Sequence, residues 1–242
     1  YKLVNILVVD QHVLVNDRLL ALYPQLKYVC SANTGHSHFL FSLRTYPVHL
    51  VTLRNEVEFL SKIHSVSEFT FKLILDLLRS HSNVNHTLFN KTLGIVGLGR
   101  IGKHVAKIAK GFGMTVITYD KRDDQQDLIA LFKKSDIITI HTSENDTSKH
   151  LVSDGLIRLM KKTAYLINTS RPSIVDEQAL SDCLNNGLIA GAALDVVGDK
   201  HYLNKKTKNL ITTEHVAGKT LEDRIKTDEF IISKLEKLLK DG

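Results

Sequence analysis

The chain has 242 residues, 43% of them hydrophobic and 24% charged, which is enough to bury the core of one large or two modest domains and too apolar for a disordered chain. Its formal charge of +6 is spread thinly, with small clusters at Lys161-Lys162 and Lys205-Lys206-Lys208, so we expect a solvated surface and no nucleic-acid partner. No apolar run reaches the roughly 20 residues that cross a bilayer, so we expect no membrane span.

The first third of the chain alternates apolar runs with helical patterns, which is typical of an α/β region with a parallel sheet. The first of these runs predicts a buried strand. The predicted strands lie at residues 3–9, 26–30 and 49–53, the predicted helices at 16–22 and 68–79, and a polar turn at 33–35.

Residues 80–90 are mostly polar and predict a surface connector between two units. A second alternating series follows and ends in an amphipathic helix over residues 221–240. Its members are strands at 93–96, 115–119, 137–141, 164–168, 189–194 and 209–212, helices at 101–110, 127–133 and 177–185, and a further apolar segment at 156–159.

The segment Gly97-Leu98-Gly99-Arg100-Ile101-Gly102 is a G-x-G-x-x-G between a predicted strand and a predicted helix. Gly97 allows a tight turn, Gly99 lets the backbone approach a pyrophosphate, and Gly102 lets the helix pack against the strand. Asp120 ends the next strand 18 positions after Gly102, where a carboxylate accepts hydrogen bonds from ribose hydroxyls and repels a 2′-phosphate. The pattern favours NAD over NADP, although Lys121 and Arg122 weaken that preference, and a tight turn without a ligand is the alternative.

A longer series of segments resembles one family in the same order along the chain. Residues 91–102, 113–116 and 119–120 lead into Ser135-Asp136-Ile137-Ile138-Thr139-Ile140-His141, and residues 167–171, 175–180, 191–196 and 213–218 follow. Upstream, residues 26–29, 34–35 and 65–68 continue the likeness. Together these segments resemble the D-isomer-specific 2-hydroxyacid dehydrogenases over nearly the whole chain.

The resemblance implies two Rossmann-like α/β domains with parallel sheets, the cofactor domain being inserted in a split substrate domain. Residues 1–64 with 220–242 would form the substrate domain, and residues 65–219 the NAD-binding domain. The chain would start late in that plan, because the family's first strand and helix have no counterpart. The resemblance also implies a homodimer formed through the cofactor domain.

The same resemblance assigns roles to individual residues. Arg171 would hold the carboxylate and carbonyl oxygen of a small 2-oxo acid, since a guanidinium fork binds such a group in a bidentate way. His215 would donate the proton during reduction and remove it during oxidation. Backbone amides at Thr34 and Gly35 would bind the substrate carboxylate, and Asp195 would contact the nicotinamide amide. The full set of expected cofactor residues is Gly97, Gly99, Arg100, Ile101, Gly102, Asp120, His141, Thr142, Thr147, Thr169 and Asp195.

Three positions depart from the family pattern. Lys200 stands where the glutamate that pairs with the histidine is expected, with Asp199 as a weak surrogate, and a cation there should depress the pKa of His215. Glu214 replaces a proline, and as a neighbour in an extended segment it should point away from His215. Pro172 replaces a glycine and should push Arg171 toward extended geometry.

Two functions of different class remain open on these grounds. The first is an NAD-dependent oxidoreductase acting on a small 2-hydroxy or 2-oxo acid of D configuration. The second is a catalytically impaired NAD(H)-binding regulator or scaffold, which Lys200 and Pro172 favour. The sequence does not give the side chain of the acid or the direction of the reaction.

Cysteine and histidine usage bears on compartment and metals. Cys30 and Cys183, the two cysteines, lie far apart among apolar neighbours, which favours reduced thiols in a cytoplasmic protein. The start of the chain has no secretory leader pattern. The histidine pairs lack acidic or thiol companions at ligand spacing, so we expect no metal and ordinary polar loop residues. These pairs are His36 with His38 and His81 with His86.

Overall fold

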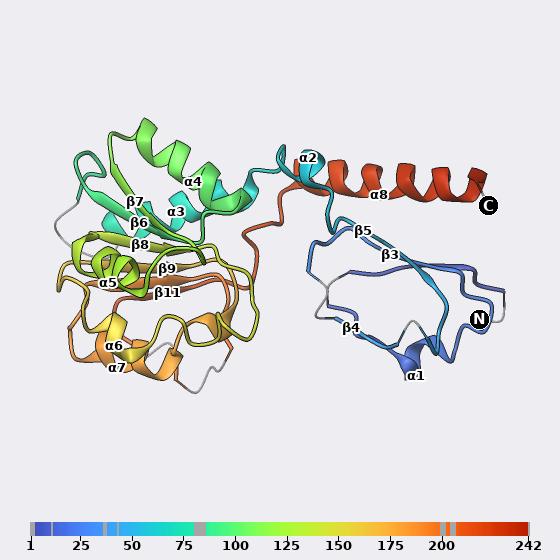
Figure 1. The fold of residues 1–242 in the computed structure, drawn as a ribbon, viewed down its shortest axis with the longest axis horizontal. Coiled ribbons are helices and arrows are strands. Elements are labelled where there is room, and N and C mark those ends of the chain that lie inside the picture. The colour runs from blue at the N-terminus through green and yellow to red at the C-terminus, as the bar shows by residue number, and fades with distance from the viewer. Residues whose placement is uncertain are drawn as a thin grey trace. The chain divides into compact units, whose positions relative to one another are not determined.

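The computed structural model describes residues 3–10, 12–35, 38–42, 44–79, 86–198, 202–203 and 207–241. The chain divides into two compact units (Figure 1). Unit 1 contains Tyr1–Ile63 and Lys219–Gly242, and unit 2 contains His64–Gly218.

Unit 2 is built on a six-stranded parallel sheet with the order β11-β10-β9-β8-β6-β7. The chain enters it at β6, runs to the edge at β7, and then returns to β8 on the other side of β6, so the strand order reverses between β6 and β8. The strands are β6 (Thr92–Val96), β7 (Thr115–Tyr119), β8 (Ile137–Ile140), β9 (Tyr165–Asn168), β10 (Gly191–Leu194) and β11 (Leu210–Thr212).

Helices cover both faces of this sheet (Figure 1). One face packs against α3 (Ser65–Arg79) and α4 (Arg100–Gly111). The other packs against α5 (Gln125–Lys134), α6 (Asp154–Ile157) and α7 (Glu177–Asn185). Because apolar layers lie above and below, the central strands are apolar at almost every position, as in other doubly covered parallel sheets.

Unit 1 contains a three-stranded parallel sheet, β1 (Ile6–Val8), β3 (Tyr28–Ser31) and β5 (His49–Thr52), in the order β1-β3-β5. A two-stranded parallel ribbon joins β2 (Val15–Asn16) to β4 (Phe39–Leu40). The helices are α1 (Asp17–Leu20), α2 (Val57–Leu60) and the long α8 (Leu221–Asp241).

The helix α8 packs on β3 and β5 through a small part of its surface. Ile231 is its buried apolar residue, and Phe230 stacks on Phe59 with ring centroids 4.0 Å apart. The Lys234 ammonium donates to the Thr52 carbonyl and pairs with Glu56. A single band of side chains therefore holds this helix against the sheet.

Several predictions from the sequence are corrected by the structure. The predicted buried strand over residues 3–9 is shorter, and as the sheet edge it leaves Val8 71% exposed. The predicted helix at 68–79 begins at Ser65, because the His64 carbonyl accepts hydrogen bonds from the first turn. The prediction of a connector between two units at 80–90 is wrong, because these positions fall within unit 2. Residues 80–85 lie outside the described residues, and Leu88 is buried in the core rather than on the surface.

The parallel sheets and the bounds of one strand are confirmed. Both sheets of three or more strands are parallel, and β7 has the predicted bounds. Cys30 and Cys183 are buried and free. None of the helices among the described residues is long and apolar enough to span a lipid bilayer.

Candidate cofactor and active site

The carboxyl ends of five strands bring the predicted site residues of unit 2 to one edge of the sheet. Gly97 follows β6, His141 follows β8, Arg171 lies three residues beyond β9, Asp195 follows β10, and His215 lies three residues beyond β11. These strands are neighbours in the order β6-β8-β9-β10-β11, about 4.8 Å apart. Ligands of open α/β sheets bind at this edge, at the point where the strand order reverses.

The glycine loop leaves space that a larger residue would fill. Gly97 has φ +98°, and a Cβ atom there would lie 2.7 Å from the backbone of His141. A Cβ on Gly102 would lie 2.1 Å from the Gly97 carbonyl oxygen, so only glycine lets α4 start this close to β6. A Cβ on Gly99, the N-cap of α4, would meet no atom within 4 Å. The first-turn N–H groups of α4 and its positive dipole end therefore adjoin open space, which suits a pyrophosphate.

His141 supplies a second observation at the same place. Its Nε2 lies 2.9 Å from Thr139 Oγ1, while its buried Nδ1 has no hydrogen-bond partner among the residues that the structure describes. Burial lowers the pKa of His141 to about 3, so the ring is neutral at pH 7. Gly97, Gly99 and Gly102 form a glycine cradle beside this ring. An unpartnered buried nitrogen next to the cradle fits a site that receives a polar ligand, and both features fit a dinucleotide.

Asp120 follows β7 at the far side of the loop. Its backbone N–H donates to Asp123 Oδ2 at 2.6 Å, and its own Oδ1 accepts from the Lys121 N–H at 2.7 Å. These local bonds fix the turn and the orientation of the Asp120 carboxylate. This arrangement suits the predicted ribose contact.

The remaining expected cofactor residues occupy different environments. Arg100 opens α4, whereas the Ile101 side chain packs into the core and leaves its backbone N–H as the group near the loop. Thr142 follows His141, and its N–H lies where a Cβ on Gly97 would clash. Thr147 is part of a local turn, with its hydroxyl donating to Asn145 Oδ1 at 2.7 Å. Thr169 is buried, with Oγ1 3.3 Å from Thr70 Oγ1.

Arg171 is held in an extended backbone, with φ −141° and ψ 144°, immediately before Pro172, which opens the short 3-10 helix η1 (Pro172–Ile174). The expected effect of Pro172 on Arg171 is therefore confirmed. The Asn168 amide donates to the Arg171 carbonyl at 2.9 Å, and Arg171 Nη1 donates to the Ser170 carbonyl at 2.8 Å. Since a guanidinium has five N–H donors, this contact leaves capacity for a carboxylate.

His215 has a left-handed backbone with φ +51°. The prediction that residues 214–215 are extended is wrong, because the His215 N–H turns back to donate to the Asp195 carbonyl at 2.9 Å. Asp195 is fully buried, and its carboxylate accepts from Thr213 Oγ1 at 2.6 Å and from the backbone N–H groups of Val216 at 2.8 Å and Ala217 at 2.9 Å. Sequence reasoning missed these contacts, since nothing in the spacing of the two segments indicates them.

Asp199, the predicted surrogate partner of His215, and Lys200 both lie outside the described residues. The start of that loop is described. Glu177 Oε1 accepts from the Gly198 N–H at 2.8 Å, which ties the loop to α7.

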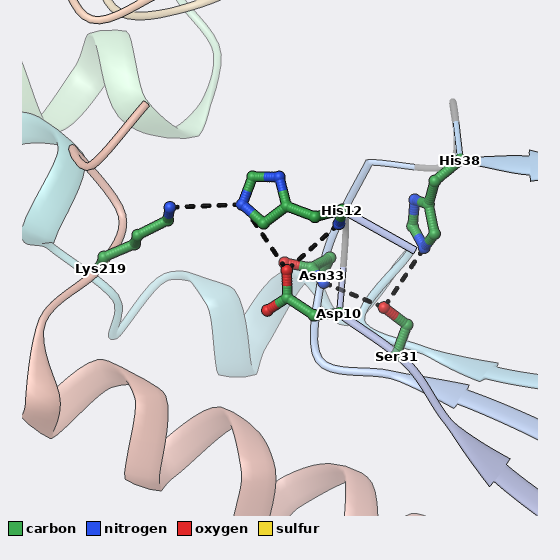
Figure 2. A network of polar contacts seen from close by, with 6 residues as sticks. All are labelled: Asp10, His12, Ser31, Asn33, His38 and Lys219. Atoms are coloured by element: carbon green, nitrogen blue, oxygen red, sulfur yellow. Dashed lines mark hydrogen bonds and ion pairs between the residues drawn. The ribbon is translucent and has the colours of Figure 1, made fainter. Parts of the chain in front are cut away.

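In unit 1, Thr34 and Gly35 follow β3 at the carboxyl end of its sheet, with Thr34 exposed. The buried Ser31 hydroxyl stabilises the loop after β3. It accepts a hydrogen bond from Asn33 Nδ2 at 3.0 Å and lies 3.5 Å from His38 Nε2 (Figure 2). His38 lies in the turn before β4, as expected of a loop residue, but it is buried, with 6% of its surface exposed. Burial lowers its pKa.

A second group of polar side chains lies at the same end of the unit 1 sheet (Figure 2). His12 Nε2 is 3.3 Å from Lys219 Nζ and 3.8 Å from Asp10 Oδ1, and all three side chains are exposed. Within the described part of the chain, no three His, Cys, Asp or Glu side chains group so as to hold a metal ion. His36 and His81 lie outside that part.

The sheet order, the glycine cradle at its switch point and the acidic end of β7 define unit 2 as a dinucleotide-binding α/β domain. The family described as "D-isomer specific 2-hydroxyacid dehydrogenase, NAD binding domain" matches residues 62–217. The chain belongs to this family, and unit 2 is its NAD-binding domain.

Curated relatives agree with this assignment. The chain is 40% identical over 265 residues to a glyoxylate reductase of Thermofilum pendens, a match that covers 93% of this chain and 76% of the relative. It is 39% identical over 165 residues to a glyoxylate reductase of Thermococcus litoralis, covering 63% of this chain and 50% of the relative. The chain thus spans between half and three quarters of the length of these relatives.

Solved structures also resemble the chain. A D-lactate dehydrogenase from Aquifex aeolicus, complexed with NAD and lactic acid, has a TM-score of 0.78 at 26% identity and covers 99% of this chain and 84% of that one. An acyclic imino acid reductase in complex with NADPH and D-Arg has a TM-score of 0.79 at 26% identity and covers 98% of this chain and 83% of that one.

Proposed function

We propose that this chain is an oxidoreductase that transfers a hydride between NAD(H) and a small 2-oxo or 2-hydroxy acid of D configuration. The observation that carries the proposal is the placement of Arg171 beyond β9 and His215 beyond β11, with β10 between them, at the same edge of the sheet that carries the glycine cradle beyond β6. This reaction needs a guanidinium to bind the acid, an imidazole to transfer a proton and a site for the dinucleotide. All three lie at one edge of the sheet in unit 2.

In the proposed reaction, bound NADH supplies the hydride that reaches the carbonyl carbon of the 2-oxo acid. The Arg171 fork binds the carboxylate and carbonyl oxygen and so fixes which carbon is presented. An imidazole nitrogen of His215 gives a proton to the carbonyl oxygen as the hydroxyl forms, and takes that proton back in the opposite direction.

The test is loss of NADH absorbance with glyoxylate, pyruvate, hydroxypyruvate and bulkier 2-oxo acids, for the protein and its Arg171→Lys and His215→Gln variants. We expect turnover by the protein and a fall of about 10²- to 10⁴-fold in kcat/KM for His215→Gln. Arg171→Lys keeps the charge and loses the fork, so it should raise KM strongly.

Two matched controls separate site chemistry from general damage. Arg158→Lys changes an exposed arginine of unit 2 that pairs with Asp154, and His150→Gln changes an exposed histidine with φ +49°, close to that of His215. Both should keep the activity of the unchanged protein. Equal losses in the controls and the site variants would contradict the assigned roles.

The second candidate function is an NAD(H)-binding regulator or scaffold without efficient catalysis, and it is favoured by Lys200 at the position of the expected glutamate. A cation at the position of the expected glutamate would disfavour imidazolium and so weaken proton donation by His215. Lys200→Glu discriminates the two. A large gain in kcat supports a weakened enzyme in which Asp199 is the poor surrogate, and no gain in an inactive, NADH-binding protein supports the regulator.

We further propose a cytoplasmic homodimer. The dimer rests on the family resemblance, and a monomeric mass by light scattering would refute it. The compartment rests on the two buried, unpaired thiols. Burial raises the pKa of the Cys30 thiol to about 11 and also raises that of Cys183, so both stay protonated and unreactive. Localisation of a tagged protein tests this assignment.

A further inference from the structure

We propose that Thr213 is a positioning residue, whose hydroxyl acts through Asp195 to hold the catalytic segment around His215. The inference rests on the proposed function for its catalytic meaning. Its structural content rests on contacts within unit 2 alone.

The first support is the contact itself. The Thr213 hydroxyl donates to Asp195 Oδ1 at 2.6 Å, the short distance of a charge-assisted bond between a hydroxyl and a carboxylate. The Asp195 residue is 0% exposed, so water does not compete for this oxygen. Both partners lie at the carboxyl ends of adjacent strands, β10 and β11, whose backbones are paired in register.

The second support is what the same carboxylate holds on the other side of His215. Asp195 Oδ1 also accepts the Val216 N–H at 2.8 Å, and Oδ2 accepts the Ala217 N–H at 2.9 Å. Residues 213, 216 and 217 therefore all donate hydrogen bonds to one buried carboxylate. The backbone of residues 213–217 curves around this carboxylate and forms an arch. His215 lies on that arch.

The third support is backbone strain. His215 has φ +51°, a left-handed conformation that is unfavourable for a residue with a Cβ. Such a conformation persists where the surrounding structure fixes it. Here two backbone bonds, Thr213 N–H to the Leu194 carbonyl at 3.0 Å and His215 N–H to the Asp195 carbonyl at 2.9 Å, act with the carboxylate to fix it. Glu214, between them, has no ring that would restrict its backbone.

These contacts assign Asp195 a role distinct from the nicotinamide contact expected from the family resemblance. Three of the roughly four lone-pair sites of its carboxylate already accept hydrogen bonds from residues 213, 216 and 217. Losing the Thr213 hydroxyl should loosen the arch and displace the His215 imidazole, while the glycine cradle around Gly97, which follows a strand four places from β11, is unchanged.

The experiment compares Thr213→Val, which removes the hydroxyl at nearly constant volume, with Thr213→Ser, which keeps it. Thr212→Val is the control, since Thr212 is the exposed neighbour at the end of β11. A displacement of about 1 Å at the reacting group costs on the order of 10²-fold in rate. We therefore expect Thr213→Val to lower kcat by about 10- to 100-fold with an unchanged dissociation constant for NADH, and the other two variants to stay close to the unchanged protein.

A parallel loss of NADH binding in Thr213→Val would overturn the proposal, because it would place the effect at the cofactor. An unchanged kcat would overturn it as well. A further readout is independent of turnover, namely hydrogen exchange of the Val216 and Ala217 amides. Exchange should become about 10- to 100-fold faster in Thr213→Val, as expected from the loss of one charge-assisted hydrogen bond, and not in Thr213→Ser. Unchanged exchange rejects the positioning role even if no 2-oxo acid is reduced, so the two hypotheses fail separately.

Discussion

The two units differ in how completely they bury their apolar side chains. In unit 2, two large clusters fill both faces of the sheet, and the exposed large hydrophobic residues among those described are Phe89, Phe112, Leu188 and Tyr202. Unit 1 has two small clusters. Its exposed large hydrophobic residues, in the part that the structure describes, are Leu3, Val8, Val13, Leu14, Leu22, Leu40, Val57, Leu221, Ile225, Ile232, Leu238 and Leu239.

The same difference holds for the two sheets that carry the candidate residues of each unit. The cradle at Gly97 and the residues Arg171, Asp195 and His215 lie at the edge of a sheet whose central strands are buried on both faces. The Thr34–Gly35 loop lies on a three-stranded sheet with a small core on either side. Because buried apolar area is the main source of stability, we expect unit 2 to be the more stable unit and cofactor binding to be its own property.

The largest effect is expected at the glycine cradle. Gly102→Val places side-chain atoms where even a Cβ would lie 2.1 Å from the Gly97 carbonyl, so NADH binding should be abolished and unit 2 destabilised. Gly99→Ala meets no protein atom within 4 Å, so it should fold normally and still weaken NADH binding by at least about tenfold, a cost of about 1.4 kcal/mol. Fluorescence titration with NADH and circular dichroism measure both. Normal affinity in Gly99→Ala would show that the pyrophosphate does not approach this residue.

The next largest effect is expected in the cores. Leu53→Ala in unit 1 and Leu166→Ala in unit 2 each remove a buried side chain, at a cost of about 2–5 kcal/mol. Leu53→Ala should lower the urea midpoint of unit 1 alone and leave NADH affinity unchanged, whereas Leu166→Ala should lower the midpoint of unit 2. Hydrogen exchange of peptides from each unit, followed through the urea transition, resolves the two midpoints.

NADH binding gives a second test of the difference in stability between the two units. NADH at about 100 times its dissociation constant should stabilise unit 2 by about 2.7 kcal/mol and leave the midpoint of unit 1 where it was. A single transition that moves as a whole with NADH, in every variant, would contradict two units of independent stability.

The smallest effect is a pH dependence in unit 2. The folded pKa of His141 is about 3, below the value of about 6.5 for an unfolded histidine. Its stabilising contribution is therefore complete above pH 6.5 and is lost as the pH falls from there toward 3, with a slope of up to about 1.4 kcal/mol per pH unit. Urea midpoints at pH 7 and pH 5 should differ less in His141→Asn than in the unchanged protein. Equal midpoint differences in the two proteins would show that another group causes the pH dependence.

Local pattern predicted most of unit 2, because its elements are long and periodic. The strand over residues 115–119 has the predicted bounds, and α4 and α5 differ from prediction by one or two residues at each end. In unit 1, the two-residue strands β2 and β4 carry no periodic signal and were not predicted. The apolar run over residues 3–9 predicted burial, but its position at a sheet edge leaves Val8 exposed.

The candidate site was also predicted only in part from the sequence. The glycine loop is contiguous in the sequence, so its spacing and its place before a helix were sufficient to find it. The left-handed backbone of His215 depends on contacts with Asp195, 20 positions earlier, and the neutral state of His141 depends on burial. Neither property is visible in a single sequence, because both follow from packing between segments.

The most direct test of the proposed function is a titration of the protein with NADH, followed in the same cuvette by glyoxylate and then larger 2-oxo acids. The predicted result is that NADH binds with enhanced fluorescence and is then oxidised, with the rate lost in His215→Gln and the binding retained. NADH that binds and persists with every acid would contradict the assignment of Arg171 and His215 to chemistry and favour the regulator instead.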